Sequence, residues 1–363
     1  MKILMLVNWN VEYADRVPAD KQPPDYYVEG EDYWFYRYFR EKPTVDVLDT
    51  HSFPWLERFE KYKIRFYILQ ALKAIPKLGK YDLIVSHGMQ SGVVVSLWRR
   101  LFKTRAKHVV FDIGSFNSAA ESGMALKLMQ FASKSIDGVI YHTGSQRDYY
   151  NRFFPWIVNK SRWIQFGTDI DYFDMRKDSY AICRERKIVG SPYIICVGYA
   201  KRDWVTLVSA YTKLSTDVHL LLVGHENEEY RSIPGVEMLP VVPIGELIDL
   251  IRGALFCVLP LQSFNYSYGQ MTLMQQMALE KCVVAAKVPS LIEYVIDGET
   301  AITYESCNAD DLAEKMKLLL QDREMCYEIG KKARKWLENC CNEKVMGKNI
   351  EQYYETILVR RQA

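Results

Sequence analysis

The chain contains no stretch of about 18 uninterrupted apolar residues, the length at which a helix can cross a bilayer. Its N-terminal run, MKILMLVNWN, lacks a small-residue cleavage site and is typical of a first strand, so no secretion signal is expected. None of the eight cysteines, between Cys183 and Cys341, has the CxxC spacing or nearby histidine of a zinc site. Repeats and low-complexity tracts are also absent, which excludes solenoids. These absences predict a cytoplasmic globular protein with reduced thiols.

What is present is an alternation of short β-branched runs with longer helical segments, which is typical of parallel strands joined by crossover helices. At 363 residues the chain has the length of two domains. The sequence therefore predicts the α/β class, with two doubly wound, Rossmann-like domains facing a central cleft. Strands are expected at 2–7, 45–48, 83–86, 108–111, 138–142 and 163–166, and again at 193–197, 219–223, 236–239, 256–259 and 282–285. Helices in the first half are expected at 32–40, 61–75, 91–102 and 124–135.

The series of strands restarts after a charged, irregular stretch, which sets the expected domain boundaries. Residues 1–170 form the first domain, 171–190 the linker and 191–345 the second domain. The remaining segment, 346–363, carries a last helix near 349–359 that is expected to pack back on the first domain.

One block, from Phe256 to Glu293, reads FCVLPLQSFNYSYGQMTLMQQMALEKCVVAAKVPSLIE. A strand is followed by a polar aromatic loop, after which Gly269 and Gln270 open a helix. Free backbone N–H groups and the positive end of the helix dipole make such a helix start a suitable seat for a diphosphate. Gln270, Met271 and Thr272 would supply these N–H groups.

This block resembles the donor-binding segment of retaining GT-B glycosyltransferases of family 4, where a Glu, seven residues and a second Glu precede A-M-A-x-G-x-P-V. The positions that follow the pattern are Gln275, Met277, Ala278 and Val283. The first glutamate, the glycine and the proline are replaced by Ser267, Glu280 and Cys282. The resemblance implies that the amide oxygen of Gln275, which stands for the second glutamate, accepts hydrogen bonds from the donor ribose. It also implies that Ser267 lies near the reacting sugar.

Three more segments resemble the same family. YIICVGYAKRDWVTLVSAY matches the strand and V-G-R turn that place Gly198, and it puts Arg202, with Lys201 beside it, at the position of a lysine. The planar fork of Arg202 suits bidentate contact with a diphosphate. LLLVGHENEEY resembles the next strand and its turn at Gly224. VVPIGELIDLIRGA resembles the loop that holds the nucleobase, with Val242 and Pro243 near the base and Glu246 near the helix start.

In the first half, YDLIVSHGMQSG, SIDGVIYHTGSQRDYY and WIQFGTDIDYFD resemble the D-x-I-x-x-H, A-D-x-V-I-x-x-S and N-G-V-D-x-x-x-F segments of the family. Asp112 ends a predicted strand near the place of a cleft histidine in the family, so it could orient or deprotonate the acceptor hydroxyl. A turn-capping role for Asp112 is an equally open interpretation. His87, at the end of another predicted strand, is either a core histidine or part of the acceptor site.

The segment ERFEKYKIRFYILQALKAIPKLGK, residues 57–80, carries seven basic and two acidic residues, and WRRLFKTRAK adds five bases. A basic amphipathic helix can lie on an anionic membrane surface, which would suit a lipid-linked acceptor. A solvated helix face is the alternative. Nucleic-acid binding is not expected, because no recognised module accompanies the charge.

The resemblance implies transfer of a hexose-type residue from a nucleoside diphosphate sugar to the hydroxyl of a glycan or lipid-linked acceptor, with retention of configuration. Arg202, Lys201 and the helix start would stabilise the leaving diphosphate as the glycosidic bond breaks. The scheme requires no metal and no further cofactor. Two other functions stay open: a nucleotide-sugar epimerase of the same fold, and a catalytically silent sugar-nucleotide binding protein, which Ser267 favours.

Overall fold

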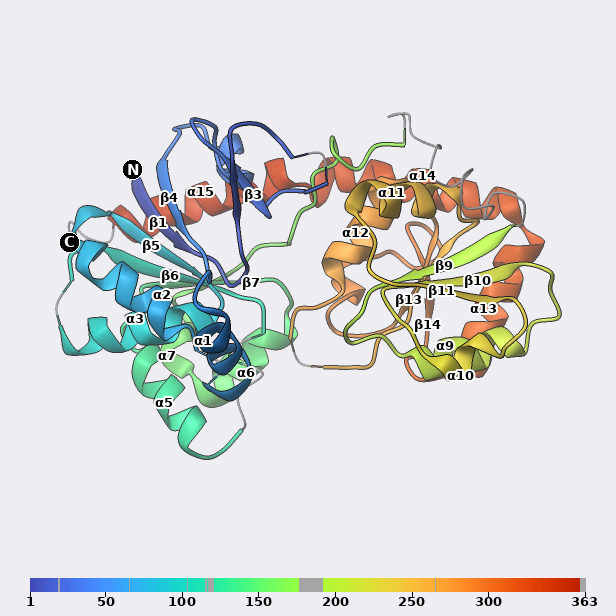
Figure 1. Cartoon of the computed structure of the whole chain (residues 1–363), viewed down its shortest axis with the longest axis horizontal. Helices are drawn as coiled ribbons and strands as arrows, with labels where there is room; N and C mark the ends of the chain where they lie inside the picture. Colours follow the sequence, from blue (N-terminus) through green and yellow to red (C-terminus); the bar gives the residue numbers. More distant parts are fainter. Residues whose placement is uncertain are drawn as a thin grey trace.

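Two lobes lie side by side in the computed structural model, one built around each half of the chain (Figure 1). Helices α14 (Arg323–Cys340) and α15 (Glu343–Val359) run along the top of both lobes, α14 over the second and α15 over the first. The structure describes residues 1–18, 20–64, 66–102, 104–114, 116, 121–175, 192–264 and 266–359, with the backbone alone at 54, 61 and 62.

The first sheet has six parallel strands in the order β4-β1-β5-β6-β7-β8. At its centre Ile3 lies opposite both Val45 and Leu83. Because all these strands run parallel, their carboxyl ends meet at one edge. The strands are β1 (Lys2–Leu6), β4 (Thr44–Leu48), β5 (Leu83–His87), β6 (Lys107–Asp112), β7 (Gly138–Tyr141) and β8 (Ser161–Trp163). The helices are η1 (Trp34–Tyr38), α1 (Pro54–Phe59), η2 (Glu60–Ile64), α2 (Ile68–Ala74), η3 (Ile75–Lys80), α3 (Met89–Leu101), α5 (Met124–Ser133), α6 (Ser145–Phe153) and α7 (Pro155–Val158).

The second sheet is also parallel, in the order β11-β10-β9-β12-β13-β14. Its order reverses between β9 and β12, and ligands of doubly wound sheets bind at the carboxyl ends beside such a point. The strands are β9 (Tyr193–Val197), β10 (His219–Val223), β11 (Val236–Leu239), β12 (Cys257–Leu259), β13 (Val283–Ala286) and β14 (Ile302–Tyr304). The helices are α9 (Trp204–Thr212), α10 (Glu228–Arg231), α11 (Ile244–Gly253), α12 (Gln270–Ala278), η5 (Ile292–Tyr294) and α13 (Ala309–Gln321).

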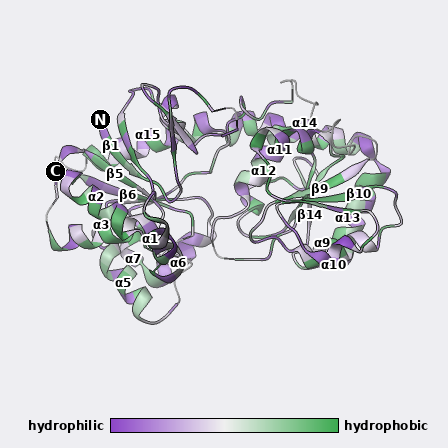
Figure 2. Cartoon of the chain, in the orientation of Figure 1, coloured by the Kyte–Doolittle hydropathy of each residue, from purple (hydrophilic) through white to green (hydrophobic). Residues whose placement is uncertain are grey.

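Alternate residues of each strand face opposite sides of the sheet, as a period of two requires. In β1, Ile3 and Met5 belong to the core that α15 covers, whereas Leu4 and Leu6 belong to the core under α2. Figure 2 accordingly shows hydrophobic residues along the strands and mixed colours on the surrounding helices. No helix among the described residues is both long and apolar enough to cross a membrane.

The chain passes between the lobes twice, and the two passages lie side by side. Thr168 forms a β-bridge with Asn342, and the backbone N–H of Glu343 donates to the carbonyl of Thr168 at 3.0 Å. A Cβ on Gly167 would stand 2.3 Å from the backbone of Asn342, so only glycine permits this approach. The close pairing forms a hinge from which α15 continues onto the first lobe.

The segment 7–33, called the excursion below, connects β1 to η1, where a doubly wound unit usually has a helix. Its strands β2 (Glu12–Ala14) and β3 (Tyr26–Val28) pair in parallel as a small sheet of their own. The side chains of this excursion line open hollows, as described below.

The predicted α/β class with two doubly wound domains is confirmed. The predicted continuous helix over 61–75 is wrong, because the chain forms α1, a π-helical turn and α2 in succession. The carboxylate of Glu60 accepts a hydrogen bond from the backbone N–H of Leu69 at 2.8 Å and caps a new helix start. Strand β8 ends at Trp163 where the prediction begins, and β14 was not predicted. Most of the predicted linker, from 176 onward, lies outside the described residues.

Candidate functional site

Two glycine turns meet at the carboxyl edge of the second sheet. Gly198 follows β9 with φ +133°, and Gly224 follows β10 with φ +89°, conformations that side chains rarely adopt. A Cβ on Gly224 would lie 3.2 Å from the carbonyl carbon of Gly198, so the turns pack against each other. The edge therefore exposes backbone without side chains, as a phosphate-binding surface does.

Helix α12 begins at the same edge. Gly269 forms its N-cap with φ +81°, and a Cβ there would meet Leu261 at 2.5 Å, so the sharp entry requires glycine. The first turn carries no acidic residue, which leaves the positive end of the helix uncompensated. Gln270 is buried, and its Nε2 makes no hydrogen bond within the described part of the chain.

The guanidinium of Arg202 joins the glycine turns to this helix. Its Nε donates to the carbonyl of Val197 at 2.8 Å, and its Nη2 donates to Oγ1 of Thr272, in the first turn of α12, at 2.9 Å. A Cβ on Gly198 would lie 2.6 Å from Cζ of Arg202, so the glycine makes room for the guanidinium. Burial lowers the pKa of Arg202, which still carries its charge at neutral pH. Within the described residues no carboxylate pairs with it.

A partly buried cation that pairs with no carboxylate in the described part of the chain, next to an uncompensated helix start, is the electrostatic signature of an anion site. The guanidinium is already fixed by the carbonyls of Val197 and Ala200 and by the hydroxyl of Thr272. It can therefore accept an anion without first losing its own conformational freedom.

Lys201 lies apart from this group and packs against the aromatic loop that connects β12 to α12. Its Nζ is 4.5 Å from the ring centroid of Phe264 and 5.6 Å from that of Tyr266, which are cation–π distances. Ser267, half-buried, belongs to the same loop. A Cβ on Gly114, which follows β6 of the first domain, would lie 2.9 Å from Cβ of Tyr266. The aromatic loop thus reaches across to the first domain.

Gln275 lies five residues after Gln270, the first residue of α12, and also faces the first domain. Its Nε2 donates to Oε1 of Gln22 at 3.0 Å. A narrow pocket lies here, lined by residues of both domains that include Gln22, Pro23, Met271 and Gln275. Val242 and Pro243 follow β11, which β10 separates from β9, so they stand farther along the same edge from Arg202.

The carboxyl edge of the first sheet has a different chemistry. Asp112 is fully buried, and its Oδ1 accepts the backbone N–H of Gly114 at 3.0 Å and that of Phe116 at 3.4 Å. Its Oδ2 accepts the hydroxyl of Tyr150 at 2.5 Å. These bonds hold the turn after β6, which favours the capping interpretation of Asp112 over a direct reaction with the acceptor. His87 is also buried, with Nδ1 3.2 Å from Oδ1 of Asn8, and burial lowers its pKa to about 3.

Three groups at the domain boundary were not predicted from the sequence. The imidazole of His142 is fully buried with Nδ1 2.7 Å from the carbonyl of Ile164, and burial lowers its pKa to about 4. Glu293, from the second domain, accepts the backbone N–H of Gly144 at the start of α6 with both oxygens, at 3.1 and 2.9 Å. Its only sequence signal was a carboxylate shortly after a Pro-Ser turn.

The third group is an ion cluster at the hinge. Nη2 of Arg37 donates to Oδ2 of Asp169 at 2.7 Å and to Oε2 of Glu343 at 2.6 Å. Nε1 of Trp34 donates to the other oxygen of Glu343 at 3.0 Å. Burial raises the pKa of Glu343 to about 7, opposed by Arg37 and assisted by the charge of Asp169. No local sequence motif predicts this cluster, because its members lie far apart in the sequence, in η1, the hinge and α15.

Comparison with known proteins agrees with this arrangement. Residues 184–336 match the sequence model of the family described as Glycosyl transferases group 1. An uncharacterized glycosyltransferase of Methanocaldococcus jannaschii is 30% identical over 128 residues, 35% of this chain and 35% of that protein. The capsular polysaccharide biosynthesis glycosyltransferase CapM of Staphylococcus aureus is 31% identical over 91 residues, 25% of this chain and 24% of that protein. The matches thus span about a third or a quarter of these relatives.

Solved structures match over nearly the whole chain. HepE of Anabaena, in complex with UDP and glucose, has a TM-score of 0.72 at 14% identity, covering 98% of this chain and 100% of that one. Sucrose-phosphate synthase from Thermosynechococcus elongatus has a TM-score of 0.70 at 18% identity, covering 99% and 100%. At such identities the likeness establishes the fold, which is GT-B.

Proposed function

We propose that this chain, whose residues 184–336 match the Glycosyl transferases group 1 family, is a glycosyltransferase that uses a nucleoside diphosphate sugar as donor. The acceptor is a hydroxyl of a glycan or of a lipid-linked glycan, and transfer proceeds with retention and without a metal. One observation carries the proposal: the partly buried guanidinium of Arg202 at the start of α12, which pairs with no carboxylate among the described residues.

In this scheme the diphosphate occupies the edge between Gly198 and Gly269. Negative charge grows on the leaving diphosphate as the glycosidic bond breaks, and Arg202 stabilises that charge in a site already organised for it. The N–H groups of Gln270, Met271 and Thr272 add the field of the helix start. Lys201 supplies a second cation once it leaves the ring of Phe264.

The other donor-site residues are assigned by position. Gly224 allows close approach beside Gly198. Val242 and Pro243 hold the base, Gln275 contacts the ribose and Ser267 faces the donor sugar. Asp112 is assigned to the turn after β6 because both of its oxygens are bonded there. It acts on the reaction only by shaping the loop that Tyr266 contacts.

The experiment is a transfer assay with purified protein, UDP- and GDP-sugars, and a panel of glycan and lipid-linked acceptors. HepE was solved with UDP and glucose, so UDP-glucose is the first donor to test. We expect nucleoside diphosphate release that an acceptor accelerates, with a new glycoside in the product. Sugar isomerisation without any acceptor would contradict transfer and favour an epimerase.

A catalytically silent sugar-nucleotide binding protein is the second candidate, because a serine stands at Ser267 where the family carries its first glutamate. The two functions separate in one titration. Saturable UDP or GDP binding with neither hydrolysis nor transfer across the panel would favour the silent protein. Turnover above a control with Arg202→Ala would favour the enzyme.

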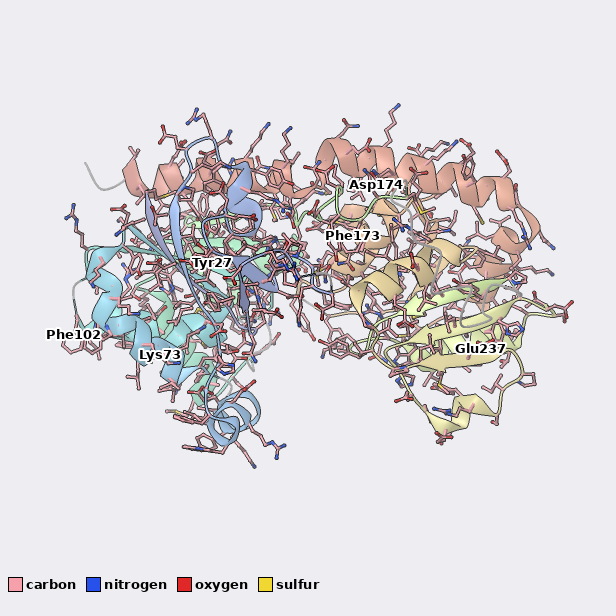
Figure 3. The ribbon with its side chains drawn as sticks, turned by 45° about the horizontal axis from the view of Figure 1, so that its top comes forward. Tyr27, Lys73, Phe102, Phe173, Asp174 and Glu237 are labelled. Carbon is pink, nitrogen blue, oxygen red and sulfur yellow. The ribbon has the colours of Figure 1, made fainter. Side chains whose placement is uncertain are left out.

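We further propose that the first domain docks on an anionic membrane. The surface formed by α1, the π-turn and α2 exposes aromatic and aliphatic side chains, with Trp55 70% and Leu72 56% exposed. The bases Lys63, Lys73 and Lys77 are exposed beside them. Arg65 and the side chain of Lys61 lie outside the described residues. Figure 3 labels Lys73 and Phe102, from the end of α3, on the same side of the first lobe. Apolar insertion combined with basic charge is the chemistry of peripheral membrane binding.

Sedimentation with vesicles of phosphatidylglycerol and phosphatidylcholine tests this docking. Replacing Lys63, Lys73 and Lys77 by alanine should lower the bound fraction, and so should Trp55→Ala. Replacing three exposed lysines of the second domain, Lys317, Lys332 and Lys335, is the matched control. Equal sedimentation of all variants would refute the docking surface.

A further inference from the structure

The excursion between β1 and η1 sets three tyrosine rings in a row. Tyr13 of β2 and Tyr27 of β3 are partners in the parallel register, so both project from the same face. Their ring centroids are 6.0 Å apart, and the ring of Tyr33 follows 5.7 Å beyond that of Tyr27. Figure 3 labels Tyr27 on this excursion.

Hydrogen bonds hold the outer two rings in place. The hydroxyl of Tyr13 donates to the carbonyl of Val47 at 3.1 Å, and that of Tyr33 donates to the carbonyl of Pro24 at 2.8 Å. Burial, together with the nearby charge of Asp49, raises the pKa of Tyr13 to about 12, so the hydroxyl stays a donor at physiological pH. Yet Tyr13 remains 57% exposed. A ring that is fixed but left in water is arranged for contact rather than for the core.

Open hollows of about 380 and 350 Å³ flank the row, and Tyr27 lines both. The charged side chains that line the first hollow are the carboxylates of Asp15 and Glu29, whereas Glu31 and Asp32 line the second together with Arg37. The carboxylates of the first hollow repel phosphate and uronate groups and offer acceptors for hydroxyl donors. This contrasts with the cationic donor edge.

The second hollow leads toward the donor domain. It shares Pro23 and Trp34 with the narrow pocket at the domain boundary, whose far wall is Met271 and Gln275 of α12. A chain molecule that lies over the tyrosines would therefore point at the donor helix. The excursion and the donor helix are also joined directly, since Gln22 accepts the hydrogen bond of Gln275.

We infer that the excursion binds a neutral saccharide chain, the part of the acceptor glycan that lies away from its reacting hydroxyl. The C–H faces of pyranose rings stack on Tyr13 and Tyr27, while their hydroxyls donate to Asp15, Glu29 and Glu31. The inference rests on the proposed function and adds to it the class of acceptor: neutral and at least a few sugars long.

The test is saturation-transfer NMR and titration with neutral trisaccharides, namely maltotriose, cellotriose, chitotriose and mannotriose, and with trigalacturonate as the anionic counterpart. We expect at least one neutral trisaccharide to bind through its ring C–H protons and trigalacturonate not to bind. Tyr13→Ala should weaken the neutral ligand about tenfold or more, because an exposed stacking face is lost. Tyr13→Phe should retain binding within about threefold, because the ring remains.

The matched control is Tyr327→Ala, which removes a tyrosine of similar exposure from α14. Binding of no neutral trisaccharide, preference for trigalacturonate, or equal binding by wild type and Tyr13→Ala would each overturn the inference. Titration with UDP separates this result from the proposed function. If UDP binds and no saccharide does, the proposed saccharide site on the tyrosine row is refuted and the proposed donor site is retained. If a saccharide binds and UDP does not, the saccharide site is retained and the donor site is refuted.

Discussion

At the carboxyl edge of the second sheet, glycine turns lie beside Arg202, a cation that pairs with no carboxylate among the described residues. At that of the first sheet, β5 and β6 end in the buried His87 and Asp112, and the buried His142 follows β7. Arg202 is bonded to two carbonyls and a hydroxyl, all of them neutral, so its positive charge remains available. Asp112 has both oxygens bonded by its own turn and by Tyr150. The pKa values of His87 and His142 are lowered by burial to about 3 and about 4, so both rings are neutral.

Both sheets are six-stranded and parallel, although their strand orders differ, β4-β1-β5-β6-β7-β8 against β11-β10-β9-β12-β13-β14. The chemical difference between the two edges comes from the side chains at the strand ends. A doubly wound sheet supplies an edge where loops converge, and the residues in those loops decide what the edge can bind. The second edge is arranged for an anion. At the first edge the polar side chains are buried among aromatic residues. The exposed polar groups of the first domain that could bind a ligand lie instead in the excursion between β1 and η1, which carries tyrosines and carboxylates.

Of the substitutions considered, Arg202→Ala should have the largest effect on the difference between the two edges, because it removes the cation from the second. Loss of the charge-assisted bonds should weaken UDP binding by about 10- to 100-fold and reduce transfer at least as much. Isothermal titration with UDP measures the affinity, and Arg202→Lys, which keeps charge without the fork, should lose less. Affinity unchanged in Arg202→Ala would remove the residue from the site. Circular dichroism must show a native fold, because Val197 and Thr272 also lose a partner.

Asp112→Ala should lower the free energy of unfolding and leave the affinity for the donor nucleotide nearly unchanged. Two N–H groups and the hydroxyl of Tyr150 lose their buried acceptor, which should cost about 2–4 kcal/mol of unfolding free energy. UDP affinity at a temperature where the variant is folded should stay within about twofold. Denaturant unfolding and titration of the same sample provide both values. A stable variant that binds UDP but has lost transfer would instead make Asp112 part of the acceptor site.

Glu343→Gln probes the hinge that joins the two edges. Burial raises the pKa of Glu343 to about 7, above its ordinary value, so the folded state holds this proton more tightly than the unfolded chain. Its contribution to stability is fully present below about pH 4.5 and is lost as the pH rises through 7, a change of up to about 3 kcal/mol. Glutamine keeps a carbonyl for Trp34 but cannot ionise.

The wild-type protein should therefore lose stability relative to Glu343→Gln between pH 5 and 8, as measured by thermal unfolding across that range. Arg37 and Asp169 remain in both proteins and provide a common background. Parallel curves would show that Glu343 is ionised throughout and would place its pKa well below 7.

Gln22→Ala should have the smallest effect. It removes a single partly buried hydrogen bond between the excursion and Gln275, worth about 1 kcal/mol at most. UDP affinity should change by about threefold or less, and Gln321→Ala on the exposed end of α13 is the matched control. A loss of UDP affinity as large as that of Arg202→Ala would mean that the first domain holds the nucleotide directly. Nucleotide binding would then be shared between the two domains.

Most of the fold could be predicted because each strand is a short aliphatic run and each crossover has helical spacing. β9, β10 and β11 begin and end at the predicted residues. The failure at 61–75 has a physical cause, since the cap that Glu60 provides to Leu69 links residues nine apart and no helical pattern signals it. The short strands β2 and β3 depend on pairing with each other across an irregular loop.

The site divides in the same way. Gly269 and Thr272 were predicted from a helix start, and Gly198 and Arg202 from the resemblance of their segment to a known family. The structure brings them together because they follow neighbouring strands of one sheet. Lys201 was expected beside Arg202 but lies on Phe264, a contact that depends on the path of the aromatic loop. The clasp between Glu293 and Gly144 joins residues 149 positions apart, so tertiary structure alone reveals it.

Hydrogen–deuterium exchange with and without saturating UDP, repeated with GDP, tests the central claim most directly, because it reads both sheet edges in one experiment. The account predicts the largest protection in residues 198–202 and 269–275, and little change around His87 and Asp112. Protection concentrated at the edge of the first sheet, or none with either nucleotide, would contradict a donor site at the second.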